Sequence, residues 1–146
     1  MRHITIYICI LAAILTLGGC QNNGDIGYLY GTWRFESFTV DGEPQTVAEH
    51  TTVSFQNDII MVQRVLDAEM SYLNYFGRWS ESGDVMTVDF AQTVGGEPVD
   101  APAYLGWSGG APMEMRVSDR SDRSMTWTYS GAADGAVRVY RLRKTY

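Results

Sequence analysis

The sequence predicts an all-β fold, an eight-stranded antiparallel up-and-down barrel. From Thr32 onward, apolar residues recur mostly at a spacing of two, which places them on one face of each strand. Turn residues interrupt this alternation about every ten residues, as in a series of hairpins, and no long helical pattern competes with it. Eight short strands can also divide into a β-sandwich, but closure into a barrel leaves no unpaired edge.

The first predicted strand, Thr32–Val40, shows the alternation clearly. Trp33 and Phe35 lie on one face, with Arg34 between them on the other. The strand ends at Asp41-Gly42, a dipeptide that favours tight hairpin turns because both residues tolerate positive φ. The other seven predicted strands, in chain order, are His50–Phe55, Ile59–Leu66, Met70–Ser80, Val85–Phe90, Met113–Ser118, Ser124–Tyr129 and Ala136–Arg143.

Polar turn residues separate these strands. Gln56–Asp58 joins the second strand to the third, and Glu81–Asp84 joins the fourth to the fifth. The segment from Ala91 to Ala111 is long and glycine-rich for a connection in a compact domain, and long loops often carry function. Single helical turns are expected only near Asp25–Tyr30 and Ala101–Leu105. The last two connections are Asp119–Asp122 and Gly131–Gly135.

Composition and charge describe one compact, acidic domain. The chain has 146 residues, of which 45% are hydrophobic and 19% charged, and its formal net charge is −6. A nucleic acid is not expected as a partner, because a polyanion is bound by a basic face. The predicted body contains no apolar run long enough to span a bilayer, which argues against a multi-pass membrane protein.

The first residues, Met1–Cys20, resemble a bacterial lipoprotein signal. Arg2 and His3 precede an apolar stretch from Ile4 to Leu17 of about 14 residues, which suits a signal peptide and is too short to span a bilayer. Leu17-Gly18-Gly19-Cys20 then resembles a lipobox, in which the cysteine is acylated. The resemblance implies a signal peptide at 1–19, a lipidated Cys20 with a tether at 20–30, and a barrel domain at 31–146. The alternatives are an uncleaved anchor and an ordinary signal peptide with a chance cysteine.

The location implied by this leader is the bacterial cell envelope, with acyl chains such as palmitate as the membrane anchor. Gln21 rather than aspartate follows Cys20, which favours the outer membrane over the inner one. No run of acidic residues follows Cys20, so a periplasmic and a surface-exposed position both stay open. Because Cys9 leaves with the leader and Cys20 is acylated, the mature domain is expected to form no disulfide.

Three motifs resemble lipocalins by their order along the chain: Gly31-Thr32-Trp33, Gly77-Arg78-Trp79 and Tyr140–Lys144. This order, from Gly31 to Lys144, is similar to that of small lipocalin-like lipoproteins of Bacteroides-type bacteria. In lipocalins the first motif closes the bottom of the barrel, and a basic residue from the last strand lies against the indole. The resemblance therefore implies barrel-closing roles for Gly31, Trp33, Arg141 and Arg143. The disulfide, second loop motif and C-terminal helix of the animal proteins are absent, so no ligand type is implied.

A barrel of this size either holds one small ligand or is filled by its own side chains. If Trp33 faces inward, the period of two places further apolar residues inside, and they would line a cavity or form a packed core equally well. The candidate ligand-lining residues are Phe35, Phe55, Met86, Phe90, Met125, Trp127 and Tyr140. The candidate mouth residues are Tyr72, Tyr104 and Trp107, with Tyr75 and Tyr129 as further tyrosines that fit there. Cross-strand pairing and loop anchoring are the alternative roles of this second set.

Catalytic residues are not evident, and we expect no enzymatic activity. His50 is the only histidine outside the leader and has no companion in the sequence for a metal site or a catalytic triad. Acidic pairs such as Asp119 and Asp122 lie in predicted turns without a calcium-loop pattern. Neither a serine elbow nor a phosphate-binding glycine loop is present. No metal or cofactor is therefore expected.

Two functions fit these observations. The first is a membrane-anchored lipoprotein that binds a small apolar or amphipathic molecule in the barrel, with Ala91–Ala111 bordering the opening. The second is a filled barrel that acts as a protein-interaction or inhibitor module of the cell envelope. An internal void favours the first function, whereas a solid core with an exposed apolar patch favours the second.

Overall fold

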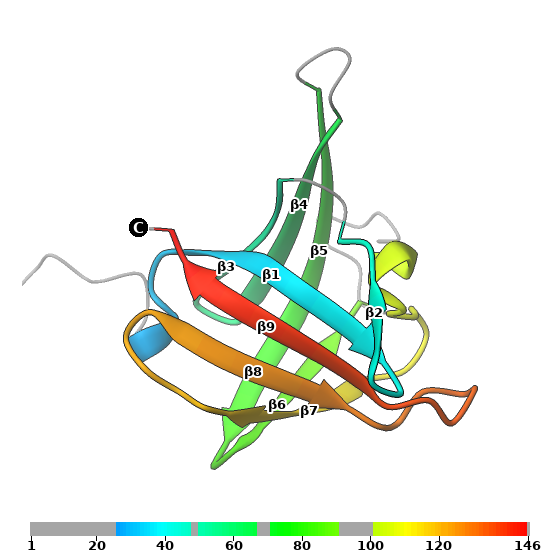
Figure 1. Cartoon of the computed structure of the whole chain (residues 1–146). Coiled ribbons are helices and arrows are strands. Elements are labelled where there is room, and N and C mark those ends of the chain that lie inside the picture. The colour runs from blue at the N-terminus through cyan, green and yellow to red at the C-terminus, as the bar shows by residue number, and fades with distance from the viewer. Residues whose placement is uncertain (1–25, 48–49, 67–70, 91–100, 146) are drawn as a thin grey trace, which may run out of the picture.

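The chain folds into a closed antiparallel β-barrel (Figure 1). The computed structural model describes residues 26–47, 50–66, 71–90 and 101–145. The strands are β1 (Thr32–Val40), β2 (Glu43–Gln45), β3 (Thr51–Gln56), β4 (Ile59–Leu66), β5 (Ser71–Ser82), β6 (Val85–Asp89), β7 (Met113–Ser118), β8 (Ser124–Tyr129) and β9 (Arg138–Lys144). They form one sheet, in which β1 also pairs with β9. This pairing closes the wall, so the barrel prediction is confirmed and the β-sandwich alternative is wrong.

Eight strands form the wall, and β2 is an addition to it. β2 pairs only with the last residues of β1, and all three of its residues are exposed. The sequence predicts only a turn at Asp41-Gly42, whereas in the structure the residues after this turn pair back onto β1 as a short ladder. Pro44 has no backbone N–H to donate to a ladder, and it is tolerated here because β2 is an edge strand that pairs with β1 alone. Four predicted strands have the observed bounds, namely Thr32–Val40, Ile59–Leu66, Met113–Ser118 and Ser124–Tyr129, and the ends of the other four differ by at most two residues.

Part of the sequence prediction lies outside the described residues. This holds for the signal peptide, for Cys20 and most of the tether, and for residues 91–100 of the long connection. The helical turns expected near Asp25–Tyr30 and Ala101–Leu105 are confirmed. They are the 3₁₀ turns η1 (Gly27–Leu29) and η2 (Ala103–Leu105). Among the described residues, no helix has the length and hydrophobicity needed to cross a membrane.

A β-bulge in β1 keeps its apolar residues inside the barrel. Phe35 pairs with Leu142 and Ser37 pairs with Arg141, so Glu36 is the extra residue. Before the bulge, Trp33 and Phe35 are buried, and after it the buried position shifts to Phe38. The inward spacing therefore changes locally from two residues to three.

The barrel has two different ends. η1 lies where β1 begins, which we call the closed end, and η2 lies where β1 finishes, which we call the open end (Figure 1). Beyond the open end, β4 and β5 extend together as a hairpin (Figure 1). β5 pairs with β6 only from Arg78 onward, so among the described strands its residues 71–77 pair with β4 alone.

Trp33 closes the barrel at the closed end. Its indole is fully buried, and Nε1 donates a hydrogen bond of 3.1 Å to the Leu29 carbonyl. The ammonium of Lys144, the last residue of β9, lies 5.2 Å from the centroid of the Trp33 ring system. The same ammonium donates a hydrogen bond of 3.2 Å to the Tyr28 carbonyl. Gly31 precedes this contact with a φ of 104°, a conformation that other residues rarely adopt.

The assignment of Arg141 and Arg143 to barrel closure was wrong. Both side chains are exposed, and Arg143 forms an ion pair of 2.7 Å with Glu36. The alternation along β9 is the reason, because Tyr140 and Leu142 face the interior and the residues between them must face outward. The cation against Trp33 is therefore Lys144, which follows Leu142 by two positions.

Replacement of Trp33 by alanine should lower the free energy of unfolding by about 3–5 kcal/mol, the usual cost of removing a large buried aromatic side chain. Lys144→Met should lower it by about 0.5–1 kcal/mol through loss of the cation–π contact. Arg141→Met is the matched control on the exposed side of β9 and should change it by less than about 0.5 kcal/mol. Urea denaturation followed by circular dichroism measures all three. Equal losses for Lys144→Met and Arg141→Met would contradict the assignment of Lys144.

Candidate binding site at the open end of the barrel

The interior of the barrel is packed with aromatic and methionine side chains. All seven candidate ligand-lining residues are buried at 4% exposure or less and belong to one hydrophobic core: Phe35, Phe55, Met86, Phe90, Met125, Trp127 and Tyr140. Their inward position agrees with the period of two in the sequence. They contact one another, as Phe35 does Trp127 at a ring-centroid distance of 6.1 Å. A role in ligand contact stays a prediction for this set.

Trp107 occupies the centre of this core, although it comes from the connection between β6 and β7. Its ring centroid lies 5.8 Å from those of Phe90 and Tyr140, 6.1 Å from that of Phe35 and 6.2 Å from that of Trp127. The sequence predicts Trp107 as a residue of the barrel mouth. The structure places its indole inside the barrel, where it is 2% exposed and fills space between the strands.

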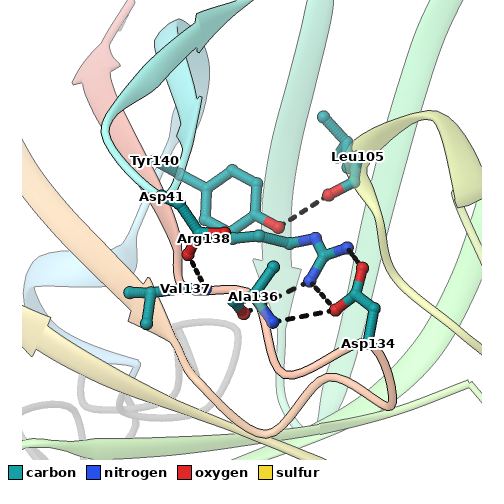
Figure 2. Close-up of polar contacts among 7 residues, drawn as sticks. All are labelled: Asp41, Leu105, Asp134, Ala136, Val137, Arg138 and Tyr140. Carbon is teal, nitrogen blue, oxygen red and sulfur yellow. Dashed lines mark hydrogen bonds and ion pairs between the residues drawn. The ribbon is translucent and has the colours of Figure 1, made fainter.

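Two residues of β9 hold the segment that carries Trp107 (Figure 2). The Tyr140 hydroxyl donates a hydrogen bond of 2.6 Å to the carbonyl of Leu105 in η2. Arg138 packs against Gly106, where an added Cβ would lie 2.3 Å from the guanidinium Nε. Gly106 also has a φ of 72°, so this position favours glycine for both space and conformation.

Arg138 is the only charged residue among the buried side chains that the structure describes. Its guanidinium forms two hydrogen bonds with the Asp134 carboxylate, of 2.5 and 3.0 Å (Figure 2). These bonds, with a third from the Ala136 backbone N–H, hold the pKa of Asp134 at about 2, below its ordinary 3.8. Arg138 therefore has its counter-ion within the loop that precedes β9.

The turn after β1 meets the loop before β9. The backbone N–H of Val137 donates to the Asp41 carboxylate, and the backbone N–H of Asp41 donates to the Val137 carbonyl, both at 2.8 Å. Figure 2 shows the first of these bonds beside the Arg138 pair. Asp41, predicted as a turn residue, thus also ties the two rim loops together.

A groove of about 510 Å³ opens to solvent at this end of the barrel. Its lining residues are Tyr75, Ala101, Ala103, Tyr104, Trp107, Ser108 and Gly109. Tyr75 and Tyr104 face each other with ring centroids 5.9 Å apart, and the Arg64 guanidinium carbon lies 5.2 Å from the Tyr104 centroid. Burial raises the pKa of Tyr104 to about 12, so its phenol is neutral at physiological pH.

The predicted mouth residues are only partly brought together. Tyr104 and Trp107 line the groove, as does Tyr75, but Tyr72 does not. Tyr72 is 56% exposed and pairs with Val65, on the opposite face of the hairpin from Tyr75. The sequence already indicates that the two tyrosines face opposite sides, because they are three positions apart along one strand and side chains alternate between the two faces.

Hydrogen bonding in the core is incomplete. The indole N–H groups of Trp107 and Trp127 have no hydrogen-bond partner among the described residues. Burial raises the pKa of Tyr140 well above its ordinary value, and the neighbouring Trp107 opposes this only in part. No hydrogen bond of normal geometry joins Trp107 to Tyr140. The centre of the barrel is therefore held by packing more than by polar contacts.

Two other grooves lie away from the open end. One, of about 470 Å³, adjoins η1 at the closed end, and the other, of about 550 Å³, lies along β5 and β6. Both include Trp79, whose ring packs on Phe55 at 5.2 Å, and Asp58, which forms an ion pair with Arg78. Gly77 of the same motif leaves room for Phe90, since an added Cβ would lie 3.0 Å from that ring. The mid-chain Gly-x-Trp thus serves core packing.

Comparisons with known proteins support the fold. No protein-family model matches the chain, and no curated protein matches it. A lipocalin-like protein from Bacteroides uniformis has a similar structure, with a TM-score of 0.60 and 20% identity over 81% of this chain and 99% of that one. The fold is lipocalin-like.

Two further structures resemble this lipocalin-like barrel. An uncharacterized protein from Bacteroides eggerthii has a TM-score of 0.59 and 17% identity, over 80% of this chain and 98% of that one. A redesigned β-barrel has a TM-score of 0.50 and 17% identity, over 82% of this chain and 93% of that one. At these identities the similarity concerns the fold.

The Asp134–Arg138 pair should make the stability of the barrel depend on pH. Because the pKa of Asp134 is lowered in the folded state, the pair stabilises the fold above pH 3.8, and this contribution is lost as the pH falls toward about 2. Asp134→Asn should therefore be less stable than wild type at pH 7, and the difference should shrink at pH 2. Urea denaturation at several pH values measures it. Asp84→Asn, which removes an exposed ion pair with Arg116, is the matched control and should have little effect at any pH.

Proposed function

We propose that this chain is a lipid-anchored, non-enzymatic protein of the bacterial cell envelope that binds a small apolar or amphipathic molecule. The groove at the open end, lined by Tyr75, Tyr104 and Trp107, carries this proposal. Its volume of about 510 Å³ lies within the range of small-molecule sites, roughly 300–1,000 Å³. The aromatic rings offer apolar area, and the Tyr75 phenol and the exposed Ser108 beside them offer polar groups for orientation.

The groove is a better candidate than the centre of the barrel. A ligand at the centre would have to displace Trp107, which packs against four other aromatic rings. A ligand in the groove can lie against the outer side of the same segment without this displacement, because the groove is open in the structure as it stands. The candidate ligand-lining residues would then form the core on which the groove-lining segment packs, without touching the ligand.

A second function, the protein-interaction module, is favoured by a different observation. Three large apolar side chains are exposed where the β4–β5 hairpin leaves the barrel: Leu66 and Leu73 on one face of the hairpin, and Tyr72 on the other. A protein-interaction module needs no internal cavity, and the packed interior of the barrel agrees with this. Leu66 and Leu73 share a face with Tyr75, whereas Tyr72 lies on the opposite face, so a variant at Tyr72 tests the second function without altering the groove.

The neutral fluorescent probe N-phenylnaphthylamine should bind the purified protein and become brighter on entering the groove. Tyr75→Ala should weaken its binding about five- to tenfold, since an aromatic contact contributes roughly 1 kcal/mol. Tyr72→Ala is the matched control on the outer face and should leave the affinity unchanged. Absence of probe binding, or equal effects of the two variants, would count against a ligand site in the groove.

Membrane anchoring through Cys20 is the part of the proposal supported by the lipobox-like sequence. Cys20→Ser should move the protein from the membrane fraction to the aqueous fraction of the cell envelope, because the acyl chains are then not attached. Membrane sedimentation measures the change, and an unaltered circular dichroism spectrum shows that the barrel is intact. A variant that still sediments with membranes would be evidence against a lipid anchor.

A further inference from the structure

Arg64 is a charged residue at the open end that the proposed function leaves unused. It lies on β4 on the same face as Ile60 and Val62, both fully buried, so its side chain is directed toward the inner side of the open end. The guanidinium carbon lies 5.2 Å from the centroid of Tyr104, which lines the groove. Arg64 thus borders the groove from the hairpin side.

The strand register gives the same position independently. Val62 pairs with Tyr75, and Arg64 pairs with Leu73, so Arg64 and Tyr75 are diagonal neighbours on one face of the hairpin. Diagonal neighbours on a sheet are within reach of long and aromatic side chains. Arg64 therefore lies beside Tyr75, two residues nearer the tip of the hairpin, and its guanidinium lies over the ring of Tyr104.

Arg64 has no carboxylate partner within the described parts of the chain. Five arginines there form ion pairs with acidic side chains: Arg78, Arg116, Arg120, Arg138 and Arg143. The described residues include 11 acidic side chains, so a shortage of acids among them does not explain why Arg64 has no carboxylate partner there. Arg34, Arg123 and Arg141 also lack such a partner among the described residues, but all three are exposed.

The contact with Tyr104 leaves Arg64 able to bind a ligand. A cation–π contact uses the positive charge and consumes none of the five N–H donors of a guanidinium. These donors match the two oxygens of a carboxylate, and they bind sulfonate and phosphate oxygens equally well. Arg138, the other inward arginine of the open end, is buried and already binds the Asp134 carboxylate through both Nη groups.

We propose that Arg64 binds the anionic head group of a free amphipathic acid whose apolar body lies against Tyr75 and Tyr104. This inference rests on the proposed function and specifies the ligand class of the same groove. The net negative charge of this protein disfavours an anionic ligand in general. Binding of an anionic ligand in the groove therefore depends on the local positive charge of Arg64. An uncharged amphiphile of the same shape lacks this contribution.

Two fluorescent probes with the same aromatic body provide the test. Anilinonaphthalene sulfonate carries an anionic group, and N-phenylnaphthylamine is its uncharged counterpart. Fluorescence titration of wild type at low salt should give about five- to tenfold tighter binding of the sulfonate, a ratio that salt reduces by screening. Arg64→Gln should weaken sulfonate binding by the same factor and leave the uncharged probe unaffected.

Two variants control for structural effects. Arg64→Lys keeps the charge and should retain most of the preference for the sulfonate, which a purely structural role of the guanidinium would not predict. Arg34→Gln removes an exposed arginine from the outer wall and should change neither affinity. An equal loss for both probes in Arg64→Gln would overturn the inference, because it would reflect damage to the groove rather than loss of a charge partner.

The possible outcomes separate the inference from the proposed function. If wild type binds both probes equally and Arg64→Gln changes neither, the head-group inference fails while ligand binding in the groove stands. If wild type binds neither probe, the proposed function itself fails. Sedimentation of Cys20→Ser protein with phosphatidylglycerol vesicles, lost in the double variant with Arg64→Gln, would assign Arg64 to a bilayer lipid and overturn the choice of a free acid.

Discussion

The hydrogen bonds between β1 and β9 are the constraint on which the rest of the structure depends. They run from Trp33 opposite Lys144 to Val40 opposite Arg138 and convert a series of hairpins into a closed wall. Closure fixes the two faces of every strand, because alternate residues must then point into one shared interior. Lys144 and Arg138 are the two ends of β9. Lys144 therefore contacts Trp33 at the closed end, and Arg138 contacts Gly106 at the open end.

The closed wall creates an interior that has to be filled, and the way it is filled positions the candidate site. Strand residues such as Phe35, Trp127 and Tyr140 supply part of the aromatic core, and the connection between β6 and β7 supplies Trp107. Packing at close to crystal density is the normal state of a protein interior. With the centre occupied, the accessible aromatic surface lies at the rim, in the groove beside Tyr104.

Two inward arginines at the open end differ in what surrounds them. Arg138 is buried, and a buried charge is costly unless it is paired, so its bidentate contact with Asp134 is a structural requirement. Arg64 is only partly buried and can remain hydrated while it contacts the Tyr104 ring. The first arginine holds the segment with Gly106 in place, and the second is the residue that we propose to select a ligand.

The sequence by itself determined the fold class, the order of the strands and the composition of the core, because the period of two and the turn residues are local properties of the chain. The resemblance to lipocalins pointed to Trp33, which the structure buries at the closed end, and the tyrosines expected at the mouth include Tyr104, which lines the groove. Tertiary structure alone decided the bulge at Glu36, since a bulge is defined by the register with a partner strand. The position of Trp107 was decided in the same way, because a residue in an irregular connection has no period that indicates which way it faces.

The candidate site follows the same division. Alternation along β9 excludes Arg141 and Arg143 and indicates Lys144, whereas the pairing of β9 with β1 was an expectation of the barrel prediction that only the structure established. The contact of Arg64 with Tyr104 joins two segments that are far apart in the chain, and it exists because the closed barrel brings the β4–β5 hairpin and η2 to one rim. Local patterns determine which residues face inward, whereas closure of the barrel determines which of them meet.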